Sequence, residues 1–161
     1  RGIRKGERNE MEYLIGGILA LAVGGFAAGT GFDRSRAFYP TVLIVIGSYY
    51  VLFAVMGAPA RDLWAEIAFA VFVSLVAAIG FRKNLWLVAA MMAGHGIFDF
   101  FHASIITNPG VPLWWPGFCM TFDVVAGAWM AFLLRWRPEP SLQTRFVSPK
   151  RTSAPAGRPG A

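Results

Sequence analysis

Apolar residues fill five long stretches of this chain, and short polar or proline-containing loops separate them. The stretches are Tyr13–Phe32, Ala37–Ala60, Leu63–Phe81, Leu85–Ile106 and Val111–Leu134. A helix needs about 20 apolar residues to cross the roughly 30 Å hydrocarbon core of a bilayer. Only helices and closed barrels satisfy their own backbone polar groups there. The pattern therefore predicts an all-α, polytopic integral membrane protein with a bundle of five transmembrane helices.

The segments on either side of this predicted 13–134 membrane domain have a different composition. Residues 1–12 form a basic N-terminal segment, and residues 135–161 form a basic tail that contains five prolines. Such a tail has too few apolar residues to fold alone. It predicts an arm that binds anionic lipid or a partner subunit.

Charge is scarce and unevenly placed. The chain is 15% charged, against about 25% in a typical soluble domain, and only seven of its 24 charged residues lie between Phe38 and Leu134. This disfavours a soluble enzyme and a disordered chain, and a single cysteine, Cys119, disfavours a disulfide scaffold. The net charge of +6 comes from the chain ends and the loops, where lipid head groups are the expected partner and nucleic acid is not.

The basic residues also predict an orientation. The loop at 33–36, the loop at 82–84 and the start of the tail fall on one side of the bilayer, and each carries two Lys or Arg residues. Short cytoplasmic loops are enriched in Lys and Arg, so the C-terminus is expected in the cytoplasm. The four basic residues that precede the first span argue the other way.

Small residues recur every four positions in the first span. Such rows allow close helix packing where lipid provides no hydrophobic driving force. They predict packing within the bundle, with a homodimer face as the alternative. The first row is Gly16, Ala20, Gly24 and Ala28, and a neighbouring pair is Gly25 and Gly29.

Polar residues in the fourth stretch form the most informative pattern. His95, Asp99 and His102 stand at i, i+4 and i+7, so they share one helix face. An antiparallel hairpin centred near Pro109-Gly110 places His95 level with Asp123 or Val124 in the fifth stretch. It places Asp99 level with Met120 or Cys119, and Glu66 of the third stretch enters at about the depth of His102. Because an acid at mid-membrane costs about 2.5–3.5 kcal/mol on insertion scales, these groups should face one another.

This constellation predicts a metal site. Imidazole and carboxylate on facing helices are the ligands from which bundle cores build such centres, and they suit zinc, iron, manganese or copper. The candidate ligands are His95, Asp99, His102 and Asp123, with Glu66 and Cys119 as additional candidates. The leading hypothesis is thus a metal-dependent membrane enzyme or transporter. His95 and His102 lie about 10.5 Å apart along the axis, too far to share one ion readily.

Two other interpretations of the same residues stay open. Titratable groups at mid-membrane also mark proton or ion relays. A His–Asp hydrogen bond can simply lock two helices together. In that case the chain would be a non-catalytic accessory subunit of a larger membrane complex, assembled through its glycine face and basic tail.

Overall fold

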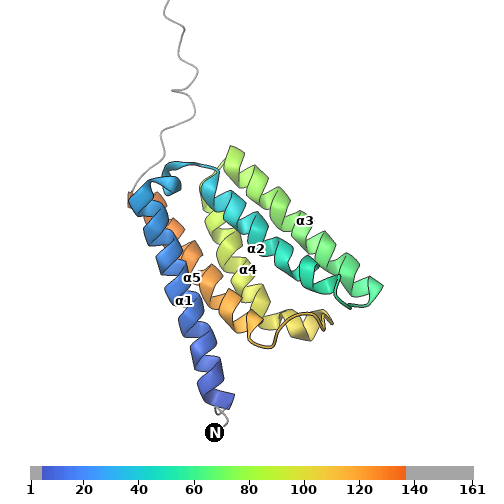
Figure 1. The fold of residues 1–161 in the computed structure, drawn as a ribbon. Coiled ribbons are helices and arrows are strands. Elements are labelled where there is room, and N and C mark those ends of the chain that lie inside the picture. Colours follow the sequence, from blue (N-terminus) through green and yellow to red (C-terminus); the bar gives the residue numbers. More distant parts are fainter. Residues whose placement is uncertain (1–4, 137–161) are drawn as a thin grey trace, which may run out of the picture.

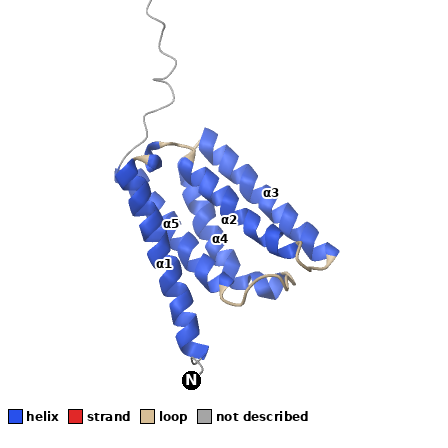
Figure 2. Cartoon of the chain, in the orientation of Figure 1, coloured by secondary structure: helices blue, strands red, loops and turns tan. Residues whose placement is uncertain are grey.

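A computed structural model describes residues 5–136, with side chains from Glu10 onward, and every regular element in that range is helical (Figures 1 and 2). The prediction of an all-α membrane bundle is confirmed. The elements are α1 (Lys5–Thr30), the short 3-10 helix η1 (Phe32–Arg34), α2 (Phe38–Ala54), α3 (Ala60–Arg82), α4 (Leu85–Ile105) and α5 (Trp115–Trp136).

The five α-helices run alternately up and down the bundle (Figure 1). Helix α5 packs against α1 and α4, and α3 packs against α2 and α4. Helix α4 also touches α2, so it lies at the junction of the two groups. The start of α1 and the end of α5 lie at opposite ends of the bundle (Figure 1).

Four helices are long and apolar enough to cross a membrane: α1 from Glu10, α3, α4 and α5. Helix α2 is apolar but has only 17 residues and ends at Ala54, not at Ala60. The chain leaves the helix because Gly57 adopts a φ of 150°, which glycine tolerates and other residues avoid. Pro59 then precedes the first turn of α3. The molecule is therefore a multi-pass membrane protein.

The loops are tied to the helix ends by specific hydrogen bonds. Asn84 caps α4, where its side chain accepts a hydrogen bond from the Trp86 backbone N–H at 2.9 Å. Arg36 Nε donates to the Phe81 carbonyl at 2.7 Å. This bond satisfies one of the last carbonyls of α3 and fixes the loop before α2 against the neighbouring helix end.

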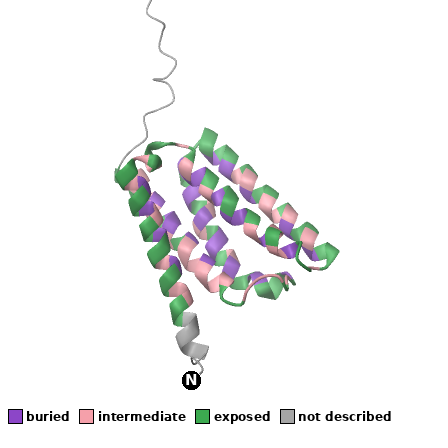
Figure 3. Ribbon diagram, viewed as in Figure 1, coloured by how far each residue is buried: buried purple, intermediate pink, exposed green. Residues whose placement is uncertain are grey.

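Many large apolar side chains lie on the exposed surface of the bundle, and several polar groups are buried inside it beside the apolar core. Figure 3 shows the exposed and the buried residues along each helix. Large apolar side chains such as Ile18, Leu75 and Phe100 are more than half exposed. In contrast, Glu66, His95, Asp99 and Asp123 are almost completely buried. This inverted distribution suits lipid around the bundle, because lipid solvates apolar side chains and not charged ones.

The first small-residue row packs inside the bundle, as predicted. Gly16, Ala20 and Gly24 are buried, and a Cβ added at Gly16 would overlap the Phe118 carbonyl oxygen of α5. At Gly24 it would lie 2.8 Å from Trp129 Nε1, also of α5. The row therefore seats α1 on α5. Gly25 and Gly29 face open space.

Candidate functional site

The polar face that the sequence predicts for α4, with His95, Asp99 and His102, points into the bundle. His95 and Asp99 have no exposed surface, and His102 is 2% exposed. They are buried because α4 contacts α2, α3 and α5 at once, so one whole face of α4 is covered by protein. The large residues of the other face, Phe101 and Ile105, are more than half exposed on the outside of the bundle.

Three of the predicted residues meet at one centre. His95 Nδ1 lies 2.8 Å from Asp123 Oδ2 and 3.5 Å from Asp99 Oδ2. Because an ionised carboxylate only accepts hydrogen bonds, His95 Nδ1 donates the hydrogen bond to Asp123 Oδ2. One ligand atom from each of His95, Asp99 and Asp123 lies within 4.8 Å of the others. The predicted alignment of His95 with Asp123 is confirmed, and we call these three residues the His95 centre.

Two glycines let such short side chains meet across a helix pair. A Cβ at Gly96 of α4 would lie 2.7 Å from the Met120 carbonyl oxygen. A Cβ at Gly127 of α5 would lie 3.0 Å from the Ala89 carbonyl oxygen. Contacts of this kind allow close approach of membrane helices. The glycines therefore bring the α4 and α5 backbones close enough for a histidine to reach an aspartate.

Tyr50 of α2 completes the wall of the His95 centre, and the sequence pattern did not single it out. Its buried hydroxyl has no hydrogen-bond partner among the described residues, and it lies close enough to Asp99, Asp123 and Cys119 to feel their charge. Its ring stacks on His102, with centroids 4.1 Å apart. A tyrosine in an apolar stretch gives no polar signal of its own, and only the packing of α2 against α4 reveals its position.

The other predicted residues form a second, separate cluster. His102 Nε2 lies 2.7 Å from Glu66 Oε1, at the depth predicted for this pair. Asn108 Nδ2 donates to Glu66 Oε1 at 2.9 Å and to the Tyr50 carbonyl at 3.1 Å. We call His102, Glu66 and Asn108 the His102 cluster. It connects α3, α4 and the α4–α5 loop, and its members are not in the group whose ligand atoms come together around His95.

Asn108 should be a structural residue of the His102 cluster. The Asn108→Ala change removes the amide donor to a buried carboxylate, so we expect a loss of about 1–3 kcal/mol in the free energy of unfolding. Thermal unfolding in detergent measures this loss. In a Glu66→Gln background the same change should cost much less, because the carboxylate that it serves is gone. Equal losses in both backgrounds would contradict this role.

Several buried polar atoms of the His95 centre have no hydrogen-bond partner among the described residues. No protein partner within the described range bonds to His95 Nε2, to either Asp99 oxygen or to Asp123 Oδ1, and all of them are buried. Two ionised aspartates carry two negative charges, and one imidazole supplies at most one positive charge. With both aspartates ionised the three residues carry a net negative charge, which a cation or a proton on one carboxylate would balance.

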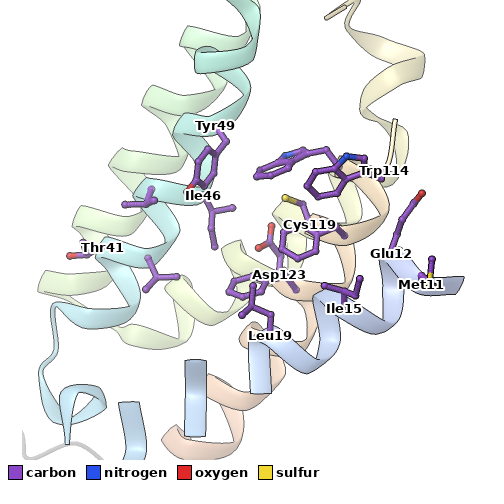
Figure 4. A pocket seen from close by; sticks show the side chains of 15 residues that line it. Met11, Glu12, Ile15, Leu19, Thr41, Ile46, Tyr49, Trp114, Cys119 and Asp123 are labelled. Atoms are coloured by element: carbon purple, nitrogen blue, oxygen red, sulfur yellow. The ribbon is translucent and has the colours of Figure 1, made fainter. Parts of the chain in front are cut away.

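Cys119 lies one turn before Asp123 on α5 and is buried. It is not among the three residues whose ligand atoms come together. Both Cys119 and Asp123 line a cavity between α1, α2 and α5 (Figure 4). The buried centre is thus connected to a space that reaches the outer part of the bundle.

No family model matches this chain, and neither the curated proteins nor the solved structures contain a similar protein. The chemistry of the His95 centre must therefore carry the assignment of a function.

Proposed function

We propose that the His95 centre binds one divalent transition-metal ion and that the chain is a metal-dependent membrane protein. His95, Asp99 and Asp123 would be the protein ligands. Their nitrogen and carboxylate donors suit zinc, iron or manganese, and copper fits an imidazole as well. Compared with the sequence hypothesis, the ligand set no longer includes His102, because its ring nitrogens are not in the group of ligand atoms that come together around His95.

The observation that carries the proposal is the convergence of two buried carboxylates on a single imidazole. Two carboxylates with no exposed surface stand beside a single imidazole, and both oxygens of Asp99 have no hydrogen-bond partner in the described chain. Buried charges are normally paired or bound to metals. A divalent cation would balance the two carboxylates and leave the imidazole neutral, which is the form that ligates a metal.

Three protein ligands leave coordination positions open, as in catalytic zinc sites. An ion held this way polarises a substrate oxygen or acidifies a bound water. Around it, Tyr50 and Cys119 supply further polar groups. This arrangement favours a metal-dependent enzyme over a purely structural ion, whose coordination sphere is normally closed by protein.

Elemental analysis of freshly purified protein tests the proposal. We expect about one zinc, iron, manganese or copper ion per chain after exhaustive dialysis. Chelator treatment should remove the ion, and one of these four metals should restore it to the same stoichiometry. Protein that holds no transition metal and takes up none on titration would overturn the proposal.

A proton relay is the second candidate, because Tyr50 bridges the two polar sites. Its ring stacks on His102 of one cluster, and its buried hydroxyl lies near Asp99 of the other centre without a hydrogen bond to it. Glu66, His102, Tyr50 and Asp99 thus follow one another from the end of the bundle to its middle, and a relay would need proton transfer across the steps that have no hydrogen bond. Such series mark proton pathways in membrane proteins.

The Tyr50→Phe change tests the relay. If protons pass along this series, the change should reduce proton flux into liposomes at least tenfold, since it removes the bridging hydroxyl. Tyr49→Phe is the matched control, because Tyr49 is the adjacent residue and packs on Trp115 instead. Asp123→Asn should abolish the flux as well. A wild-type chain without flux, or a Tyr50→Phe variant with full flux, would exclude the relay.

We also propose that the end of the bundle where α5 terminates faces the cytoplasm. That end carries Arg34, Arg36, Arg82, Lys83 and Arg135, in agreement with the positive-inside rule. A cysteine introduced at Ser35 should therefore resist impermeant thiol reagents in intact cells.

The predicted accessory role depends partly on the tail at 137–161, which lies outside the described residues.

A further inference from the structure

One end of the bundle carries a group of exposed cations, which we call the basic rim. Its members are Arg34 of η1, Arg82 and Lys83 where α3 ends, and Arg135 in the last turn of α5, and all four are exposed. These segments lie at the same end of the bundle (Figure 1). The described chain has one acidic residue at this end, Asp33. The rim therefore holds an excess of positive charge.

We propose that the basic rim binds the head group of an anionic phospholipid. The lipid phosphate would lie against the guanidinium and ammonium groups, and the acyl chains would run along the exposed apolar side chains of the helices. The inference goes beyond the proposed metal function, because the rim shares no residue with the His95 centre or the His102 cluster.

Hydrogen bonds from Arg36 hold two segments of the rim together. Arg36 belongs to the loop before α2, and its Nε donates to the Phe81 carbonyl of α3 at 2.7 Å. Its Nη2 donates to the Gly80 carbonyl at 3.4 Å. The loop at 33–36 is thus fixed beside the loop at 82–84. Positive charges held close to one another repel, so a negative group bound among them is stabilising.

Exposed aromatic side chains next to the rim favour a lipid over a soluble anion. Phe81 directly precedes Arg82 and is 41% exposed, and Phe32 is 57% exposed two positions before Arg34. Trp86 is exposed at the same end, and tryptophans gather at the level of the lipid head groups. A partner that matches this surface has negative charge at one end and hydrocarbon directly below it. An anionic phospholipid has this chemistry.

The charge of the rim also favours an anionic head group over a zwitterionic one. A choline head group carries a positive charge beside its phosphate, and the rim would repel it. Each Lys or Arg close to an anionic membrane surface strengthens binding about fivefold. Several such residues on one rim should therefore give a clear preference for anionic lipid.

A photoreactive phosphatidylglycerol, with its reactive group next to the glycerol, tests the proposal. It is added at a low level to phosphatidylcholine nanodiscs that hold the full chain. We expect crosslinks to concentrate on residues 31–37 and 81–86, mapped by peptide mass spectrometry. A phosphatidylcholine probe with the same reactive group should label these residues at least fivefold less. Soluble glycerol 1-phosphate should reduce the labelling less than twofold, because it has no acyl chains.

Two arginine variants of α3 provide the matched comparison. Arg82→Gln removes a cation of the rim and should lower phosphatidylglycerol labelling of residues 31–37 about fivefold. Lys83→Gln should have the same effect. Arg61→Gln removes an arginine at the opposite end of the same helix, where its side chain is 89% exposed, and should leave the labelling unchanged. Thermal unfolding in phosphatidylcholine nanodiscs checks that the three variants are folded.

Four results would overturn the proposal. They are equal labelling by the two lipid probes, crosslinks spread evenly over both ends of the bundle, equal losses in Arg82→Gln and Arg61→Gln, and full competition by glycerol 1-phosphate. The last result would mean that the rim binds soluble phosphates. The experiment needs no ion in the His95 centre, and both faces of a nanodisc have the same lipids. The metal proposal and the proposed orientation therefore stand or fail separately from this one.

Discussion

Replacing Asp99 with alanine should lower the metal bound per chain at least tenfold. Asp99 would supply one of only three protein ligands, and neither of its oxygens has a hydrogen-bond partner in the described chain. The change also removes one of the two negative charges that attract a divalent cation. Elemental analysis after dialysis measures the loss, and a titration with the metal found in the wild-type protein gives the change in affinity.

Glu66→Gln is the control for this experiment. Glu66 is the other fully buried acid next to a histidine of α4, so its replacement perturbs a similar environment outside the proposed ligand set. The Glu66→Gln protein should keep its metal, even if it unfolds at a lower temperature. Equal metal loss in both variants would show that general destabilisation, and not ligation, explains the effect.

Alanine at Gly96 and alanine at Gly94 should change stability in opposite directions. Both glycines lie inside α4, where alanine is normally more favourable than glycine by about 0.5–1 kcal/mol. A Cβ at Gly94 meets nothing within 4 Å, whereas one at Gly96 would lie 2.7 Å from the Met120 carbonyl oxygen and 3.0 Å from the Asp123 Cβ. Overpacking of this kind costs about 1–3 kcal/mol, because the α4 and α5 backbones must move apart.

Gly94→Ala should therefore raise Tm and Gly96→Ala should lower it, as measured by thermal unfolding in the same detergent. Gly96→Ala should also weaken metal binding, since it displaces Asp123 from His95. An increase in Tm for Gly96→Ala would mean that α4 and α5 do not pack as closely as described. A lower Tm with unchanged metal affinity would show that close packing of α4 and α5 stabilises the fold but does not position the metal ligands.

Two features of the sequence predicted the residue pairs of the site: helix periodicity, and the depth at which each residue lies in the bundle. The i, i+4, i+7 spacing puts His95, Asp99 and His102 on one face. The short loop before α5 sets the depth at which Asp123 meets His95. Both the His95–Asp123 and the His102–Glu66 pairings follow from depth alone. The depth of a residue does not tell how α3 and α5 are placed around α4. Only the structure shows that the His95 centre and the His102 cluster are separate sites.

Tyr50, Asn108 and the cavity escaped prediction for related reasons. Tyr50 sits in an apolar stretch, and its role depends on α2 packing against α4. Asn108 belongs to a loop with proline and glycine, a composition typical of a turn, and only the fold turns its amide toward Glu66. The cavity has no sequence pattern at all, because it is the space left between α1, α2 and α5.

The polar face of α4 has a consequence for how the protein enters the membrane during synthesis. Helix α4 is the least apolar of the four long spans, and it leaves the ribosome after Glu66 but before Asp123. At that moment His102 has its partner, whereas His95 and Asp99 have only each other. Stable insertion of α4 should therefore wait for α5, so that the two helices enter the bilayer together as a hairpin, with the histidine and the aspartate already paired.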